Sequence, residues 1–348
     1  MQTRIEVGIL GATGMVGQHF IKFLQGHPWF DLKWLGASDR SAGKRYRDAM
    51  TWHLGAVPES VADITVEDCK PGNAPRLLFS AMDASVATEI ERAFAQAGHV
   101  VVSNSRNHRM EQDVPLLVPE INPDHLKLVP MQQRTRGWKG QIVTNPNCST
   151  VVLTMGLAPL KQFGITKVVA TTMQAVSGAG YPGVASMDIV GNVIPFIGGE
   201  EEKMQQETQK ILGDLRGDRI EPLPAKVSAH CNRVAVVDGH TVTVSVEFST
   251  RPAEADLRRA FDTYTSVPQE RSLPSAPARP VIYMDEPNRP QPRKDAERER
   301  GMAAFVGRLR ACPVLDYKFV ALGHNTVRGA AGAAVLNAEL MHSEGMLD

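Results

Sequence analysis

Cys148, in the segment TNPNCST (residues 144–150), is the side chain best placed for chemistry. It follows an apparent strand, QIVTNPN, and precedes an apparent helix, STVVLTMGLAPL. The dipole and the free N–H groups of a helix N-terminus lower the pKa of a thiol, and the thiolate is its reactive form. The same N–H groups can hold an oxyanion that forms on a bound carbonyl. The alternative interpretation is a small, buried and inert residue, which is the usual state of a free cysteine.

Three glycines, Gly11, Gly14 and Gly17, separate an apolar run from a helical pattern in GILGATGMVGQHF. Their spacing, G-x-x-G-x-x-G, is a variant of the dinucleotide-binding fingerprint. Glycines let the backbone turn tightly and approach a pyrophosphate, whose charge then lies at the helix N-terminus. A plain tight turn is the alternative. Because the triplet follows a predicted strand and opens a predicted helix, we predict that it binds a cofactor.

The end of the second predicted strand, in GASDRSAGKRY, bears on which dinucleotide binds. An NAD site usually places an acid there for the ribose hydroxyls, and an NADP site places an arginine for the 2′-phosphate. Asp39 favours NAD. Several donors can surround a phosphate, and those present here are Ser38, Arg40, Lys44 and Arg45. We predict NADP, with surface solvation as the alternative for each single charge.

A nucleophilic thiol beside a nicotinamide indicates one chemistry. The thiol attacks an aldehyde or an activated acyl group, and a hydride passes between the thiohemiacetal carbon and the nicotinamide through a thioester. Proton transfer calls for a base with a pKa near 7, which indicates a histidine. His240, in DGHT, lies at a predicted hairpin turn, and Arg233 lies on the preceding strand. Both can point into one pocket, although a surface histidine is the alternative for His240.

Two kinds of sheet are predicted to position these residues. Before Cys148, predicted strands at residues 4–10, 32–38, 75–81 and 100–105 alternate with helical patterns, which is typical of a parallel sheet with crossover helices. After Cys148, NRVAVVDGHTVTVSVEFS alternates apolar and polar residues on both sides of a tight turn, which predicts an antiparallel hairpin. The sequence therefore predicts an α/β fold, with a Rossmann-type dinucleotide-binding domain and a second α/β domain with a mixed sheet.

Three further segments complete this outline. An amphipathic helix is predicted at residues 200–214, and a helix rich in small residues at 325–345. The segment 271–301 is rich in proline and charge, and is predicted to be extended and at the surface.

The totals of the chain exclude several classes of protein. Its 348 residues are too many for one ordinary core, so two domains are expected. The formal net charge of zero argues against a nucleic-acid or membrane-surface partner. No signal peptide and no membrane-spanning stretch are evident. Cys69, Cys231 and Cys312 lack the setting of Cys148 and are interpreted as inert; without a CxxC pair we predict no metal site, no disulfide scaffold and a cytoplasmic location.

Taken together, these motifs resemble the aspartate-β-semialdehyde dehydrogenase family, most closely its archaeal and fungal branch. The resemblance covers nearly the whole chain, and the motifs follow the family's order. They are GATGMVG, ASDRSAGKRY, SNSRNHRM, VPEIN, TNPNCST, QAVSGAG, GEEEK, NRVAVVDGHT and NTVRGAAGAAVLNAEL. Any one of them is short enough to arise by chance, but the ordered set is specific.

The resemblance implies a role for each residue of the site. Cys148 is the implied nucleophile, His240 the acid/base, and Gln174 orients the substrate. The implied substrate-binding residues are Arg233 for the α-carboxylate, Glu200 for the amine, Lys203 and Arg109 for the phosphate, and Asn147 beside the nucleophile. The EEEK run leaves Glu201 as an alternative to Glu200. The implied cofactor-binding residues are Gly11, Thr13, Gly14, Met15, Gly17, Ser38, Arg40, Ser80, Gly178 and Asn325.

The implied reaction is the NADPH-dependent reductive dephosphorylation of L-aspartyl-4-phosphate to L-aspartate 4-semialdehyde. It is a branch-point step toward lysine, threonine, methionine and, in bacteria, diaminopimelate. The implied domains are an NADP-binding domain at 1–147, completed by a C-terminal helix at 325–348, and a catalytic and dimerisation domain at 148–324. A homodimer or homotetramer is expected.

Rival interpretations remain at this stage. A relative such as a malonyl-CoA reductase keeps the cysteine, the histidine and the glycine loop but takes another acyl donor. Glutamyl-phosphate and glyceraldehyde-phosphate dehydrogenases surround their cysteine with different residues. A non-catalytic NADP-binding or redox-sensing protein needs neither His240 nor Gln174 nor Arg233.

Overall fold

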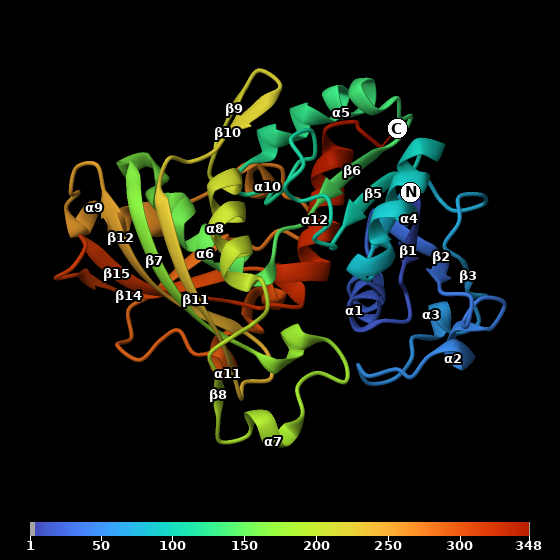
Figure 1. The fold of residues 1–348 in the computed structure, drawn as a ribbon, viewed down its shortest axis with the longest axis horizontal. Helices are drawn as coiled ribbons and strands as arrows, with labels where there is room; N and C mark the ends of the chain where they lie inside the picture. Colours follow the sequence, from blue (N-terminus) through green and yellow to red (C-terminus); the bar gives the residue numbers. More distant parts are fainter. Residues whose placement is uncertain (1–3, 348) are drawn as a thin grey trace.

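The computed structural model describes residues 4–347 and divides them between two sheets (Figure 1). The six-stranded sheet has the order β3-β2-β1-β4-β5-β6, and all its pairs are parallel. Its strands are β1 (Ile5–Leu10), β2 (Phe30–Ala37), β3 (Glu67–Asp68), β4 (Leu77–Ser80), β5 (Val100–Ser103) and β6 (Gln141–Thr144). Apolar residues fill β4 and β5 on both faces, as expected of a parallel sheet that helices cover on each side. The predicted Rossmann-type sheet is confirmed.

Helices pack around this sheet. The crossovers include α1 (Met15–Leu24) and α4 (Ala84–Ala97), both near the predicted ranges. Shorter helices follow, namely α2 (Tyr46–Ala49), α3 (Glu59–Ala62) and α5 (Val129–Arg136). The C-terminal helix α12 (Gly332–Ser343) returns to this sheet and packs against α1 and β5 (Figure 1). Its buried apolar residues therefore join the core of the N-terminal half.

The second sheet has seven strands in the order β13-β14-β15-β12-β7-β11-β8, with both parallel and antiparallel pairs. The strands are β7 (Ile165–Gln174), β8 (Val193–Ile194), β11 (Lys226–Val234), β12 (His240–Phe248), β13 (Val281–Met284), β14 (Ala304–Ala311) and β15 (Tyr317–Gly323). Helices α6 (Cys148–Leu157) and α8 (Glu200–Ile211) pack against β12 and β11 and against each other. The predicted mixed sheet is confirmed.

The predicted hairpin of residues 232–249 is wrong, because β11 and β12 do not pair with each other. Strand β7 lies between them: it runs parallel to β11 and antiparallel to β12. The connection between β11 and β12 crosses the end of β7, where the Val176 N–H donates to the Val236 carbonyl at 2.8 Å. An alternating pattern around a tight turn is the same whether two strands pair directly or accept a third strand between them, so the sequence does not distinguish the two.

The prediction that residues 271–301 form an extended surface segment is also wrong in part. This stretch contains β13 at the edge of the large sheet and the short helix α11 (Pro292–Asp295). Val281 and Asp295 are fully buried, the latter in an ion pair with Arg289. Proline is tolerated in such an edge segment because few ladder hydrogen bonds are needed there.

Further elements include α7 (Ser186–Ile189), α9 (Glu254–Thr263), α10 (Val267–Glu270) and the hairpin of β9 (Asp214–Arg216) with β10 (Arg219–Glu221). Within residues 4–347, no helix has the length and apolar content needed to cross a membrane.

Candidate active site

Cys148 lies where β6 leads into α6, as predicted. Asn147 caps this helix: its Oδ1 accepts the N–H groups of Ser149 at 3.0 Å and Thr150 at 3.4 Å, and also the Ser149 hydroxyl at 2.6 Å. An Asn cap of this kind satisfies helix N–H groups that otherwise lack a partner. The prediction that free N–H groups of this helix hold an oxyanion is therefore wrong for Ser149 and Thr150.

His240 lies in direct contact with the thiol. Its Nε2 is 3.1 Å from Cys148 Sγ, and the Ala175 N–H donates to its Nδ1 at 3.0 Å. A neutral imidazole that accepts at Nδ1 carries its proton on Nε2, so the hydrogen-bond partners assign an Nε2–H that points at the sulfur. His240 is fully buried, not at a surface turn.

Burial determines the charge of this pair. It raises the pKa of the Cys148 thiol to about 12, and the Glu200 charge acts in the same direction, while Arg109, Arg233 and the Ser149 N–H oppose it less strongly. Burial also lowers the pKa of His240 to about 3, assisted by Arg233 and His324. Both directions run against the predictions of a helix-activated thiolate and of a base with a pKa near 7. Between these two values, both groups are neutral.

Three neighbouring strands bring Gln174, Arg233 and His240 together. Gln174 ends β7, Arg233 lies opposite it near the end of β11, and His240 begins β12 at the same edge of the sheet. Gly178 packs against two of these side chains: a Cβ atom added there would lie 3.0 Å from Arg233 Nη1 and 3.2 Å from His240 Nε2. Arg233 and His240 thus share one pocket, as predicted, but through β7 and not across a hairpin.

Helix α8 places its predicted residues beside Asn147, which precedes Cys148. The Glu200 carboxylate accepts the Asn147 amide at 2.8 and 2.9 Å, the Lys203 ammonium at 2.8 Å and the Gln174 amide at 3.3 Å. Burial raises the pKa of Glu200, but these bonds outweigh it and hold the pKa below its usual range, so the group is an anion. Glu201 instead accepts the backbone N–H of Cys231. Glu200, and not Glu201, therefore lies beside Asn147.

Arg109 reaches the same place from the N-terminal half. Its Nη1 donates to Glu207 Oε1 at 3.0 Å, and Glu207 Oε2 accepts the N–H of Asn147 at 2.6 Å. Glu207 was not among the predicted site residues, although its spacing of seven from Glu200 places it on the same face of α8 and was a usable signal. Ser149, whose hydroxyl accepts a hydrogen bond from Gln174 Nε2 at 3.0 Å, was not predicted either.

Three adjoining cavities form a path that suits a dinucleotide. The first, of ≈ 270 Å³, is lined by Cys148, Gly178 and Asn325. It shares residues with a second of ≈ 620 Å³, whose lining includes Gly11, Thr13, Gly14, Met15, Ser38, Arg109, Asn147 and Lys203. Ser38 also lines a third, of ≈ 680 Å³, together with Arg40 and Asp39.

The glycine turn fits a pyrophosphate. Gly11 has a φ of +79°, and a Cβ atom there would lie 2.7 Å from the Ala81 carbonyl oxygen, so only glycine fits. No side chain caps the N-terminus of α1 and no acidic residue lies in its first turn, which leaves the N–H groups and the helix dipole for an anion.

Two predicted cofactor contacts lie elsewhere. Ser80 is fully buried, and its hydroxyl donates to Glu91 Oε1 at 2.6 Å, so it does not line the three cavities. A Cβ atom on Gly17 would lie 2.4 Å from the Gly11 carbonyl oxygen, which indicates close packing of α1 on the turn. Neither residue is retained as a cofactor contact.

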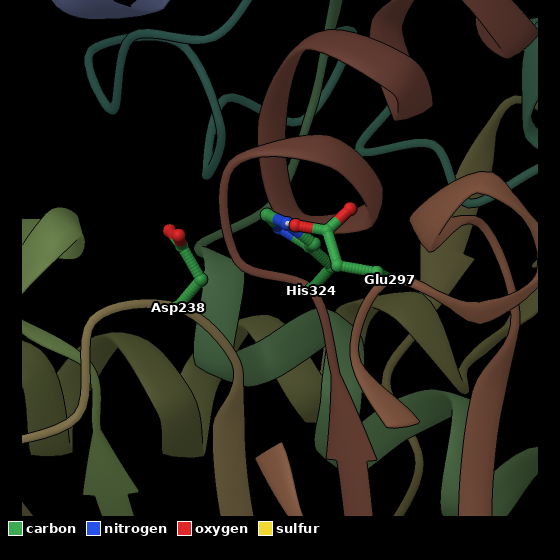
Figure 2. A group of neighbouring side chains, drawn as sticks. All are labelled: Asp238, Glu297 and His324. Carbon is green, nitrogen blue, oxygen red and sulfur yellow. Dashed lines mark hydrogen bonds and ion pairs between the residues drawn. The ribbon is translucent and has the colours of Figure 1, made fainter. Parts of the chain in front are cut away.

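A separate polar group includes Asp238, which lies two residues before His240 in the sequence. Asp238, Glu297 and His324 offer ligand atoms within 4.8 Å of one another (Figure 2). Both ring nitrogens of His324 already have protein partners, Glu297 Oε1 at 3.2 Å and Thr326 Oγ1 at 3.3 Å. Because both ring nitrogens of His324 have protein partners, we assign no metal to this group.

Comparison with known protein families gives two matches. Residues 6–129 match the semialdehyde dehydrogenase NAD binding domain, and residues 157–328 match the semialdehyde dehydrogenase dimerisation domain. The first match contains the glycine turn, and the second contains Gln174, Arg233 and His240.

Similar proteins and structures agree with these matches. An aspartate-semialdehyde dehydrogenase of Archaeoglobus fulgidus is 48% identical over 98% of this chain and 99% of its own length. The crystal structure of the Candida albicans aspartate-semialdehyde dehydrogenase with NADP has a TM-score of 0.92 and 43% identity, covering 99% of this chain and all of that chain. A Vibrio cholerae aspartate semialdehyde dehydrogenase II complexed with ASA has a TM-score of 0.78 at 25% identity, covering 99% of both chains. On this similarity, the chain belongs to the aspartate-semialdehyde dehydrogenase family.

Proposed function

We propose that Cys148 and His240 carry the reaction of this enzyme, the NADPH-dependent reductive dephosphorylation of L-aspartyl-4-phosphate to L-aspartate 4-semialdehyde. The observation that supports these roles is the 3.1 Å contact between Cys148 Sγ and His240 Nε2 at the end of the cofactor cavities. The same acyl centre needs a nucleophile and a hydrogen-bond donor, and these two groups are within reach of each other.

The first step is attack of Cys148 Sγ on the acyl carbon of the substrate. A bond forms between sulfur and carbon, and the bond from carbon to the phosphate oxygen breaks. Because the thiol is neutral and the phosphate needs one proton to leave as HPO₄²⁻, the thiol proton balances the departing group. The product on the enzyme is a thioester of Cys148.

The second step returns the thiol. NADPH, when bound, supplies the hydride that reduces the thioester carbon. Negative charge develops first on the oxygen of the thiohemiacetal and then on the sulfur as it leaves. The Nε2–H of His240 points at this group and stabilises the charge by a hydrogen bond. The aldehyde departs as the bond between carbon and sulfur breaks, and the thiolate then takes one proton from solvent water in the cavity, so that one hydride and one proton are consumed in each turnover. In this proposal His240 would act as the donor, which is one half of the predicted acid/base role.

Polar side chains around the thiol suit the two ends of the substrate. Arg233 would bind the α-carboxylate, since a guanidinium matches a carboxylate in a bidentate pair. The Glu200 anion would bind the amine, and Gln174 and Asn147 would hold Glu200 in place. Lys203 and Arg109 line the cavity beside Asn147 and would bind the phosphate.

Residues along the three cavities would hold NADP. The pyrophosphate suits Gly11, Thr13, Gly14 and Met15 at the N-terminus of α1. Ser38 and Arg40 suit the 2′-phosphate. Gly178 and Asn325, which line the cavity of Cys148, suit the nicotinamide end.

Replacing Arg233 with lysine tests the carboxylate role. Arg233→Lys keeps the positive charge but loses the planar pair of donors, so kcat/KM for aspartate semialdehyde should fall about 10- to 100-fold. The KM for NADP should stay within about twofold of the wild-type value. Initial rates of NADP reduction in the presence of semialdehyde and phosphate give both quantities. Unchanged kinetics for the semialdehyde would refute this role.

Relatives acting on other acyl donors are not favoured, because the similar proteins above carry the aspartate-semialdehyde name over nearly their whole length. A non-catalytic NADP-binding protein is not favoured either. The enzyme acts on small-molecule substrates.

We also propose the division into residues 1–147 with 325–348 and residues 148–324, of which 1–3 and 348 lie outside the described residues. The two sheets and the return of α12 to the first sheet support it. A homodimer or homotetramer is proposed as well, because β7 exposes Val169 by 45%, and Met187 and Phe196 are exposed by 89% and 71%. Sedimentation as a monomer at micromolar concentration would contradict it. The cytoplasmic location stays a prediction.

A further inference from the structure

Lys210 joins helix α8 to the loop that carries Arg109. This Arg109 loop spans residues 104–114 and follows β5 in the N-terminal half. The Lys210 ammonium donates to the backbone carbonyls of Arg109 at 2.7 Å, Glu111 at 2.8 Å and Val114 at 2.9 Å. Each of the three N–H groups of the ammonium thus has its own carbonyl acceptor in one loop, and no donor of this side chain is left over.

This lysine is almost fully buried, with an exposed fraction of 6%. Burial lowers the pKa of Lys210 to about 8, and the nearby carboxylates of Asp113, Glu111 and Glu207 oppose the decrease. The group therefore remains an ammonium at neutral pH and keeps all three N–H donors. Buried lysines are rare unless they are paired, which indicates that this one is retained for its contacts.

Glu207 makes a second connection one turn earlier on the same helix. Its two carboxylate oxygens bind different segments of the chain: Oε1 accepts a hydrogen bond from Arg109 Nη1 at 3.0 Å, and Oε2 accepts one from the Asn147 N–H at 2.6 Å. One buried carboxylate thus fixes the distance between Arg109 and the residue that precedes the nucleophile. A second donor of Arg109, Nη2, is held by the Asn104 carbonyl at 2.9 Å within the loop.

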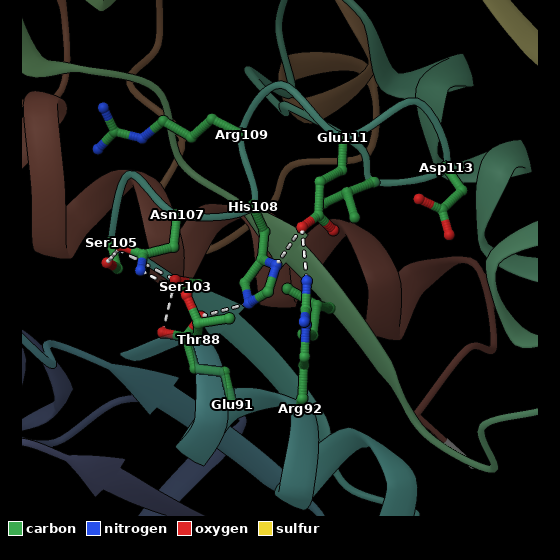
Figure 3. Close-up of polar contacts among 12 residues, drawn as sticks. Thr88, Glu91, Arg92, Ser103, Ser105, Asn107, His108, Arg109, Glu111 and Asp113 are labelled. Atoms are coloured by element: carbon green, nitrogen blue, oxygen red, sulfur yellow. Dashed lines mark hydrogen bonds and ion pairs between the residues drawn. The ribbon is translucent and has the colours of Figure 1, made fainter. Parts of the chain in front are cut away.

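The opposite side of the Arg109 loop is tied to its own domain. His108 and Arg109 leave the loop in different directions, His108 toward Glu91 on α4 (Figure 3). His108 Nδ1 lies 3.0 Å from Glu111 Oε1, and Nε2 lies 3.6 Å from Glu91 Oε2. The loop is therefore held between α4 on one side and α8 on the other, and the α8 contacts tie Arg109 to Asn147, the residue before Cys148.

We propose that Glu207 and Lys210 are positioning residues that set Arg109 at the phosphate end of the substrate, in register with Cys148. The proposal rests on the phosphate role of Arg109 proposed above. On α8, positions 200, 203, 207 and 210 fall on one face. This face thus combines two residues that would meet the substrate, Glu200 and Lys203, with two that place the opposing arginine. A guanidinium binds phosphate through fixed, planar donors, so its orientation matters as much as its charge.

The test is a double-mutant cycle between Lys210 and Arg109, with rates measured as NADP reduction at varied phosphate. Lys210→Met keeps the length of the side chain and removes the three donors. We expect kcat/KM for phosphate to fall about tenfold and the KM for NADP to stay within about twofold. Arg109→Ala should lower the same quantity by at least as much. Because Lys210 acts through Arg109, Lys210→Met in the Arg109→Ala background should change it by less than about twofold.

Glu207→Gln provides a second cycle if Lys210→Met does not fold. Glutamine keeps the size and can still accept the Asn147 N–H, but it presents an amide to Arg109 in place of a carboxylate. The same tenfold loss and the same non-additivity with Arg109→Ala are expected. Lys167→Met is the matched control, since Lys167 is half exposed on β7 and pairs with Glu247; its kinetics should equal those of the wild type.

The outcomes separate the two proposals. If Arg109→Ala leaves the phosphate kinetics unchanged, the phosphate role of Arg109 is overturned, and the positioning role with it. If Arg109→Ala has its effect while both α8 variants are silent, only the positioning role is overturned. Losses that add fully in the Arg109→Ala background, together with equal losses for NADP, would show a merely structural role and would also overturn it.

Discussion

Cys148→Ala should abolish turnover while NADP binding survives. Without the sulfur no thioester forms, and the hydride has no covalently held acyl group to reduce. We expect kcat to fall at least about a thousandfold. The glycine turn and the Ser38–Arg40 segment do not involve Cys148, so the Kd for NADP, measured by fluorescence or calorimetry, should stay within about twofold. Residual activity above a few per cent would contradict the nucleophile role.

The pH dependence of alkylation tests the charge of the same thiol. Burial raises its pKa to about 12, so the thiolate fraction increases with pH across the whole accessible range. Inactivation of the wild-type enzyme by iodoacetamide should therefore accelerate about tenfold per pH unit between about pH 7 and 9, without a plateau. A plateau at or below neutral pH would indicate a thiolate–imidazolium pair and would contradict the neutral pair. Because the Cys148→Ala variant has no turnover to lose, its alkylation is followed by mass spectrometry, which reports the reaction of the other three cysteines.

His240→Ala should lower kcat by about 10²- to 10⁴-fold, the usual range for loss of a positioned proton donor or acceptor. The alanine removes the Nε2–H that faces the sulfur and leaves the buried Ala175 N–H without its acceptor. Steady-state rates with saturating semialdehyde, phosphate and NADP give the effect on kcat. A kcat within about threefold of the wild-type value would contradict the proposed role of His240.

His240→Gln separates donation from proton exchange. A glutamine amide can donate an N–H toward the sulfur and accept the Ala175 N–H, but it does not exchange protons near neutral pH. If His240 acts mainly as a donor, this variant should retain about tenfold more activity than His240→Ala. Equal activity of the two variants would mean that the ring must carry a proton on and off, which requires the other tautomer.

Part of the site can be predicted from the sequence because its signals are local. A glycine triplet between a strand and a helix, and a cysteine at the start of another helix, are patterns that neighbouring residues create by themselves. Local signals do not decide whether Glu200 or Glu201 is the carboxylate that points into the site, because the two residues are adjacent in one helix. Their directions differ by about 100° around the axis, and only packing against Asn147 distinguishes them.

Other features depend on contacts between distant segments. The insertion of β7 between β11 and β12 is a choice of strand partner, and an alternating pattern is compatible with more than one choice. Ser80 stands at the end of a strand where a cofactor contact is reasonable, yet the buried Glu91 takes its hydroxyl. Glu207 and Lys210 are ordinary surface residues by type, and they are buried because α8 packs against the Arg109 loop and, at Glu207, against Asn147.

The amino-acid sequence by itself thus determined the α/β class, the glycine turn, the position of Cys148 at the start of a helix and the family motifs that surround it. Only the tertiary structure decided how the nucleophile is held and charged. A helix N-terminus lowers a thiol pKa by a modest amount, whereas removal from water raises it by more, and burial is a property of the whole fold. The tautomer of His240 was decided in the same way, by the Ala175 N–H that β7 brings to its Nδ1.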